Sequence, residues 1–266
     1  MNVEELRIPL DNTDVSIIKF GNGPKSFVIL PGLSVLPYNG LGTAIASGFK
    51  IFTLDYTCYF IPPKNLLPQK YSLKEVTEDT YRVIKKLGLS KVDFSGFSMG
   101  GMLCMIMAIE HPEIVNKISL ASTTPCLEKP YQQTFMDWIS LAKSKDAEKL
   151  FDNFGQKIYS NEYYQKYADA LTFVAKSITD ENLTHFITLA NAILEFDIID
   201  NLSKIKCPVQ YLGAKGDKVL NGERTEKYLK SKIVCYESYL YDGYSHAVNN
   251  EAPDFCHRII EFFKKA

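Results

Sequence analysis

The chain of 266 residues lacks most features that would assign it to a specialised class of protein. No apolar run approaches the roughly 20 residues that a transmembrane helix needs, and the first ten residues contain no apolar secretory segment. We therefore expect a cytoplasmic protein without a membrane span. Positive and negative charges are almost equal in number, with 30 Lys and Arg residues and 31 Asp and Glu residues, for a net charge of −1. This balance predicts no nucleic-acid partner.

Cysteine and histidine are few and scattered. The six cysteines form no Cys-x-x-Cys pair, and several lie in apolar runs, which is typical of reduced, buried thiols. Metal sites built from Cys and His need these residues at short spacing. The sequence therefore predicts neither a metal ion nor a cofactor. Apolar residues still make up 46% of the chain, which is ample for a core of ordinary size.

Short apolar runs of strand length alternate with longer stretches whose apolar residues recur at helical spacing. Strands that are apolar throughout and separated by helices indicate a mostly parallel sheet covered on both faces. Helices are expected at 73–87 and 254–263. The expected strands cover residues 6–9, 15–20, 26–30, 50–55, 92–95, 117–120, 209–212 and 233–239.

The alternation of strands and helices stops between residues 127 and 202. We expect an α/β core of residues 1–126 and 203–266, with a helical cap at 127–202 inserted before the last two strands. The cap holds 12 aromatic residues in 76, against 21 in the other 190. Such aromatics can line an apolar substrate pocket or form the core of the cap itself. On the first reading, the candidate substrate contacts are Tyr131, Phe135 and Trp138. The expected cap helices cover residues 132–143, 147–154, 163–177 and 181–196.

Residues 92–101 combine an apolar strand, a Gly-x-Ser-x-Gly motif and the start of an apolar helix. A sharp turn from strand to helix brings the residues two before and two after the serine together, so Gly96 and Gly100 avoid a clash. Ser98 is then expected in a strained conformation, with its hydroxyl at the C-terminal edge of the sheet. The same motif can also serve only to pack a helix closely on a strand.

A nucleophilic serine needs a base and an acid that orients the base. His246 lies in the loop between the last strand and the last helix, where a base could meet Ser98. Asp217 follows another strand, which gives the order Ser, Asp, His along the chain. Asp242 is a poorer candidate, because it is too near His246 in the chain to reach the far side of its ring.

Acyl transfer also needs N–H donors for the developing oxyanion. The backbone N–H of Met99, directly after the serine, is one candidate donor. The N–H of Leu33, in the loop after the strand at 26–30, is the second, with Ser34 as the alternative. Gly32 would let this loop approach the serine closely.

With these motifs the chain resembles the α/β-hydrolase superfamily, in its capped, esterase- or lipase-like branch. The resemblance implies a serine hydrolase with Ser98 as nucleophile, His246 as base and Asp217 as orienting acid. The motifs that carry it are Pro31-Gly32, residues 96–101, His111-Pro112-Glu113, Gly213 to Asp217, residues 243–246 and Glu251-Ala252-Pro253.

Two departures from the family pattern concern the pocket. The family usually has His-Gly where this chain has Pro31-Gly32. It often has an Asp-x-x-Gly-x-Gly-x-Ser loop after the next strand, whereas here Asp55 precedes an aromatic segment at 56–60 and a proline-rich segment at 61–68. We expect these segments to reshape the pocket entrance.

Together these residues predict an enzyme that cleaves a small, uncharged, apolar ester, a small-molecule substrate, through an acyl-enzyme. Thioesters, amides, and lyase or perhydrolase chemistry with the same three residues are the alternatives. A ligand-binding protein on the same fold is disfavoured, because binding alone has no need of a complete Ser, His and Asp set. In this superfamily a serine at position 98, rather than an aspartate, argues against epoxide or haloalkane hydrolysis.

Overall fold

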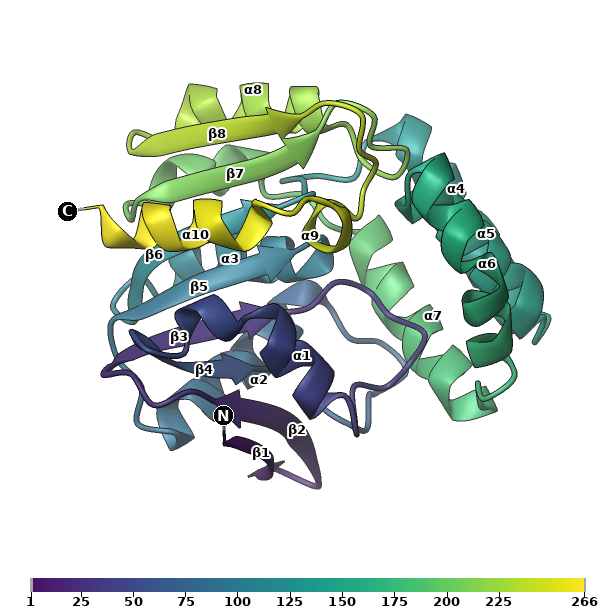
Figure 1. The fold of residues 1–266 in the computed structure, drawn as a ribbon, viewed down its shortest axis with the longest axis horizontal. Coiled ribbons are helices and arrows are strands. Elements are labelled where there is room, and N and C mark those ends of the chain that lie inside the picture. Colours follow the sequence, from purple (N-terminus) through teal and green to yellow (C-terminus); the bar gives the residue numbers. More distant parts are fainter. Residues whose placement is uncertain (1, 266) are drawn as a thin grey trace.

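The computed structural model describes residues 2–265 and contains one eight-stranded sheet in the order β1-β2-β4-β3-β5-β6-β7-β8 (Figure 1). The first two strands form an antiparallel hairpin, and β2 pairs antiparallel with β4. All other neighbouring strands are parallel, which confirms the expected mostly parallel sheet. The strands are β1 Val3–Leu10, β2 Thr13–Phe20, β3 Lys25–Leu30, β4 Tyr56–Phe60, β5 Val92–Phe97, β6 Val115–Ala121, β7 Val209–Ala214 and β8 Tyr236–Tyr241.

Helices cover both faces of the sheet, as the apolar strands require. Helices α1 and α10 lie on one face, and α2, α3 and α8 lie on the other (Figure 1). Helix α3 is buried on every side, which explains its apolar sequence. The bounds of these helices are α1 Gly42–Gly48, α2 Leu73–Lys86, α3 Met99–Glu110, α8 Gly222–Lys232 and α10 Phe255–Lys264.

The expectation of a strand at 50–55 is wrong. Lys50–Phe52 forms a 3-10 helix, and the strand is Tyr56–Phe60, the aromatic segment in which no strand was expected. The fully buried apolar residue of the first segment is Phe52, whose ring packs 4.7 Å from that of Phe27 on the face of the sheet. A short helical turn therefore buries the same apolar side chain that a strand would have buried.

Other differences concern element ends. Strand β8 is Tyr236–Tyr241 and not 233–239, because Ile233 closes helix α8 by donating its N–H to Leu229 O at 2.9 Å. Helices α1, α8 and the short α9, Val248–Glu251, were not expected from the sequence. Within residues 2–265, no helix has both the length and the apolar character needed to cross a bilayer.

Four helices stand between β6 and β7, at the edge of the sheet where the parallel strands end (Figure 1). The segments that enter and leave this region pair with each other, since Leu127 N donates to Phe196 O at 3.2 Å and Ile198 N donates to Pro125 O at 2.9 Å. This pairing closes the base of the helical cap, for which we propose the boundaries 127–202. Its helices are α4 Lys129–Lys143, α5 Ala147–Ile158, α6 Asn161–Ala175 and α7 Asp180–Leu194.

Candidate active site

Ser98 occupies the sharp turn between β5 and α3. Its backbone has φ 53° and ψ −117°, in the left-handed region that a non-glycine residue rarely adopts. A Cβ on Gly96 would lie 2.2 Å from Gly100 O, and a Cβ on Gly100 would lie 2.0 Å from Leu30 O. The turn therefore depends on both glycines. Gly96 avoids Gly100, as the motif predicts, whereas Gly100 avoids the end of strand β3.

Gly100→Ala is expected to destabilise the protein by about 3 kcal/mol, because the contact at Leu30 O is with backbone that cannot rotate away. Urea unfolding of the variant measures this loss. Gly48→Ala is the matched control, since a Cβ there meets nothing within 4 Å. Equal unfolding midpoints for the two variants would show that the turn tolerates a side chain.

Ser98, His246 and Asp217 form one hydrogen-bonded chain. His246 Nε2 lies 3.0 Å from Ser98 Oγ, and His246 Nδ1 lies 2.9 Å from Asp217 Oδ2. Asp217 Oδ1 accepts the backbone N–H groups of Val219 and Leu220, both at 2.8 Å. Ser98 and His246 are only 7% and 2% exposed, so the chain lies largely out of contact with water.

The hydrogen bond to Asp217 determines which nitrogen of the His246 ring carries a proton. A carboxylate only accepts hydrogen bonds, so His246 Nδ1 must carry a proton toward Asp217. The neutral ring then has a lone pair on Nε2, which can accept the hydroxyl proton of Ser98. The arrangement can therefore withdraw a proton from the serine. Asp242, the poorer candidate, instead pairs with Lys215 at 3.2 Å.

The two predicted oxyanion donors are the backbone N–H groups of the buried residues Leu33 and Met99, next to the hydrogen-bonded series of Ser98, His246 and Asp217. Among the described residues, neither Leu33 N nor Met99 N has a hydrogen-bond partner. A Cβ on Gly32 would lie 3.2 Å from Ser98 Cβ, so the loop before Leu33 adjoins the serine. Tyr38 donates its hydroxyl to Gly32 O at 3.3 Å. Since C=O and N–H point in opposite directions across a trans peptide, this bond helps to set the direction of Leu33 N–H.

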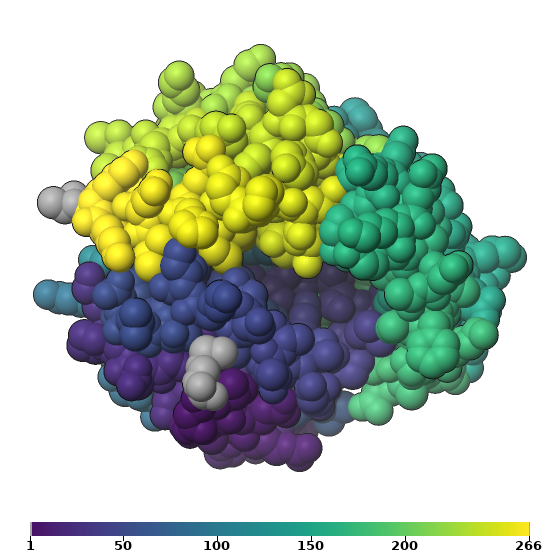
Figure 2. All heavy atoms as spheres, in the orientation of Figure 1, coloured from purple at the N-terminus to yellow at the C-terminus, as the bar shows by residue number. Residues whose placement is uncertain are grey.

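A cavity of about 420 Å³ opens beside Met99, the residue that follows the serine. Gly32 and Met99 lie in its wall, and the surface is hollowed where the first loops face the cap (Figure 2). Its volume suits a small molecule. It is bounded by the loops after β3 and β4, by helix α7 and by two residues of the first hairpin. The remaining lining residues are Arg7, Asp14, Ser34, Val35, Leu36, Pro37, Tyr38, Asn39, Pro62, Pro63, Asn65, Glu181, Asn182, His185 and Leu189.

The three cap aromatics lie outside this cavity. Phe135 and Trp138 are 2% and 1% exposed, and their rings pack 5.1 Å apart. Trp138 also donates its indole N–H to Asn153 Oδ1 at 3.0 Å within the cap. Tyr131 lines a separate small recess with Tyr228. This corrects the expectation that the three side chains line the cavity, because Phe135 and Trp138 belong to the core of the cap and Tyr131 faces α8.

Comparison with known proteins assigns the fold to a family. Residues 26–252 match the family described as "alpha/beta hydrolase fold". The chain belongs to this family. It is 24% identical over 230 residues to the "Putative carbamate hydrolase RutD" of Rhizobium rhizogenes, covering 83% of this chain and 85% of the relative. It is 24% identical over 202 residues to a "Putative esterase/lipase" of Haemophilus influenzae, covering 73% and 68%.

Solved structures of the family have the same architecture. MGS-M2, an alpha/beta hydrolase enzyme from a Medee basin deep-sea metagenome library, superposes with a TM-score of 0.88 at 18% identity, over 98% of both chains. At this level of identity the likeness concerns the fold. Within residues 2–265 of this hydrolase, no three His, Cys, Asp or Glu side chains gather in a way that could hold a metal ion.

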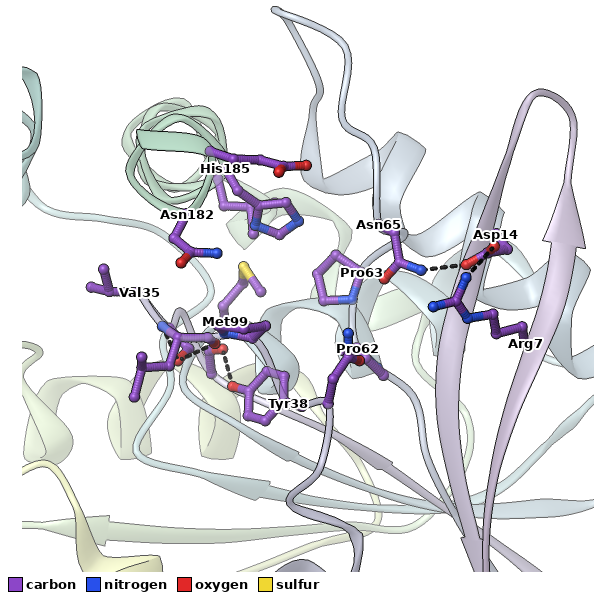
Figure 3. Close-up of a pocket in the computed structure, with 17 residues that line it drawn as sticks. Arg7, Asp14, Val35, Tyr38, Pro62, Pro63, Asn65, Met99, Asn182 and His185 are labelled. Carbon is purple, nitrogen blue, oxygen red and sulfur yellow. Dashed lines mark hydrogen bonds and ion pairs between the residues drawn. The ribbon is translucent and has the colours of Figure 1, made fainter. Parts of the chain in front are cut away.

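Two cavity residues of the hydrolase, Asn182 and His185, were not among the sequence candidates. Both lie on the first turns of α7 (Figure 3). The signal that could have located them is a capping box, in which Thr179 and Asn182 bond each other's backbone N–H. This motif starts the helix at 180 and places residues 182, 185 and 189 on one helical face.

The cap of this alpha/beta hydrolase contacts the loop that carries His246. Ser245 donates its hydroxyl to Lys157 O at 3.2 Å, and Ala247 N donates to Ile158 O at 2.7 Å. These bonds hold the residues directly before and after the imidazole. The C-terminal end of α5, which leads into the turn to α6, therefore helps to position the candidate base.

Glu251→Ala is expected to lower kcat by about tenfold, equivalent to roughly 1.4 kcal/mol, because Glu251 ties this same turn to the histidine loop. Its carboxylate accepts the backbone N–H of Ser160 at 3.0 Å and also the hydroxyl of Ser160. Steady-state kinetics with an ester, at temperatures well below the unfolding midpoint, measures the loss. Glu261→Ala, at an exposed position of α10, is the control. A wild-type kcat in the Glu251→Ala variant would show that this contact with the cap does not position His246.

Proposed function

We propose that this hydrolase cleaves a small, uncharged ester through an acyl-enzyme intermediate, with Ser98 as nucleophile, His246 as base and Asp217 as the acid that orients it. The observation that carries the proposal is the continuous hydrogen-bonded chain from Ser98 Oγ to the Asp217 carboxylate, beside a cavity of about 420 Å³. The Haemophilus influenzae relative, described as a "Putative esterase/lipase", supports an ester as the substrate class.

In the first half of the reaction, Ser98 Oγ attacks the carbonyl carbon while His246 Nε2 takes the hydroxyl proton. The carbonyl oxygen becomes an oxyanion and accepts the free N–H groups of Leu33 and Met99. The N-terminal end of α3, which begins at Met99, adds a positive dipole at the same place. His246 then gives its proton to the leaving alkoxide, and the alcohol departs.

In the second half, water replaces the alcohol. Its proton passes to His246 Nε2 as its oxygen attacks the acyl carbon, and the same N–H groups hold the second oxyanion. The proton then returns to Ser98 Oγ as the bond from this oxygen to the acyl carbon breaks. The acid is released and the hydrogen-bonded chain is restored.

A fluorophosphonate probe tests the assignment of the nucleophile. Such a probe forms a covalent bond with an activated serine hydroxyl, so we expect one adduct per chain, on the peptide that contains Ser98. Hydrolysis of p-nitrophenyl acetate should be lost in proportion to labelling. Ser238→Ala, at an exposed serine far along the chain from the site, should label normally. Hydrolysis that survives complete labelling of Ser98 would refute the proposal.

A substrate screen tests the reaction class. The cavity and the oxyanion donors favour oxygen esters, and thioesters present the same carbonyl to the same groups. We expect purified protein to hydrolyse short-chain esters faster than matched amides. Activity confined to carbon–carbon bond cleavage would favour the lyase alternative over ester hydrolysis.

A further inference from the structure

The wall of the cavity opposite Met99 has two adjacent polar side chains on helix α7, Asn182 and His185. Asn182 and His185 point from α7 toward Met99 across the cavity (Figure 3). Much of the remaining wall is apolar, with Val35, Pro63 and Leu189 among its residues. The hydrogen-bonding state of the two polar side chains therefore bears directly on what the cavity can bind.

Asn182 offers hydrogen-bond donors to the cavity. Its Oδ1 accepts the backbone N–H of Thr179 at 3.1 Å, which fixes the orientation of the amide. The NH2 group is thereby turned away from Thr179. Among the described residues this NH2 group has no hydrogen-bond partner. A ligand in the cavity can satisfy it by offering an acceptor.

His185 offers an acceptor. Its Nε2 lies 3.3 Å from the backbone carbonyl of Lys64, and a carbonyl oxygen only accepts, so Nε2 carries a proton. Burial lowers the pKa of His185, and this effect outweighs the opposing bond to Lys64 O and the charge of Glu181. The ring is therefore neutral near pH 7, and its Nδ1 has a free lone pair.

We propose that Asn182 and His185 together bind a neutral group of the substrate that accepts one hydrogen bond and donates another, such as a carboxamide. The inference rests on the proposed ester hydrolysis and names the polar end of its substrate. The two side chains are three residues apart on one helix, so their donor and acceptor lie side by side. A carboxamide presents the complementary pair, with its C=O toward Asn182 and its N–H toward His185.

Charged groups fit this wall less well. A carboxylate has no proton for His185 and would meet Glu181, which lines the same cavity. An ammonium group has no acceptor for the NH2 of Asn182. Arg7 is the cationic side chain of the wall, and it is largely exposed and lies 3.9 Å from Asp14. The cavity therefore favours a neutral polar group over an ion.

Matched pairs of esters test this inference. One member of each pair ends in a carboxamide and the other in an isopropyl group of the same shape, with the group on the acyl chain in one series and on the alcohol in the other. For wild-type protein we expect kcat/KM to favour the carboxamide by about tenfold in one series at its best chain length, as one to two net hydrogen bonds would give.

Asn182→Asp is the decisive variant, because it keeps an oxygen that accepts Thr179 N and replaces the NH2 donors with a charged oxygen that only accepts. The carboxamide preference should fall to about twofold or less, since a C=O would then face a carboxylate. His185→Phe, which removes the acceptor, should reduce the same ratio. Asn191→Ala, at an exposed position of the same helix, should retain it.

The outcomes separate the inference from the proposed function. Absence of a carboxamide preference at every chain length, an unchanged preference in Asn182→Asp, or a stronger preference for esters ending in a carboxylate would overturn the inference. In each of these cases the proposed function would still be supported if the isopropyl esters are hydrolysed and Ser98 is labelled. If neither ester is hydrolysed and Ser98 is not labelled, the proposed function fails and the inference falls with it.

Discussion

Ser98→Ala is expected to lower kcat for ester hydrolysis by about 10⁶-fold, the scale of nucleophile removal in a serine enzyme whose three residues act as a unit. The methyl group cannot form the acyl-enzyme, and His246 Nε2 loses the hydroxyl 3.0 Å away from which it would take a proton. What remains is binding in the cavity and the stabilisation of the oxyanion by two N–H groups. Steady-state kinetics measures kcat, and fluorophosphonate labelling should vanish in the same variant.

The fold must remain intact for this result to be informative. Ser98 makes no side-chain hydrogen bond that caps helix α3, so its replacement removes no structural contact of that helix. A thermal unfolding midpoint at or above the wild-type value is therefore expected. Residual activity within about a hundredfold of wild type, from a variant with a normal midpoint, would assign the nucleophile to another residue.

Asp217→Asn is expected to lower kcat by about 10⁴-fold, because the substitution reverses the tautomer of His246. The amide oxygen must still accept the N–H groups of Val219 and Leu220, which hold Asp217 Oδ1 in the native protein. The NH2 group is then directed at His246 Nδ1 and can only donate. The imidazole must carry its proton on Nε2, where it can no longer accept the proton of Ser98.

Asp242→Asn is the matched control for this experiment. Asp242 is an exposed carboxylate near His246 in the chain, and it pairs with Lys215 at 3.2 Å. An exposed pair of this kind contributes little, so kcat should stay within about twofold of wild type. A loss of less than tenfold in Asp217→Asn, or a larger loss in Asp242→Asn, would assign the orienting role to another acid.

The sequence alone determined the features that depend on local patterns. The runs expected as strands at 26–30, 92–95 and 209–212 lie within β3, β5 and β7, because strands covered on both faces are rich in apolar residues. The helical spacing from residue 73 to 87 matches α2, which begins with a capping box at Ser72 and Glu75. The glycines around Ser98 predicted the strained turn, because the clash that Gly96 avoids is with Gly100 in the same motif. The clash of Gly100 with Leu30, at the end of β3, became visible only in the tertiary structure.

The chain order of Ser98, Asp217 and His246 also led to residues that contact each other in the structure. Each follows a parallel strand, and such strands end at the same edge of a sheet. That argument needs only the strand order and not the packing of side chains. Strand order therefore predicts the candidate catalytic residues but not the shape of the cavity, which depends on side-chain packing.

Tertiary structure decided which apolar segments form strands and which side chains face the cavity. Phe52 and the strand Tyr56–Phe60 are adjacent apolar segments that both pack on Phe27, and the pairing of the second segment with β2 and β3 makes it the strand. Likewise, an aromatic residue of the cap can face substrate or its own helices, and Phe135 and Trp138 pack inside the cap. Local sequence is compatible with either outcome in each case, because burial depends on contacts between segments far apart in the chain.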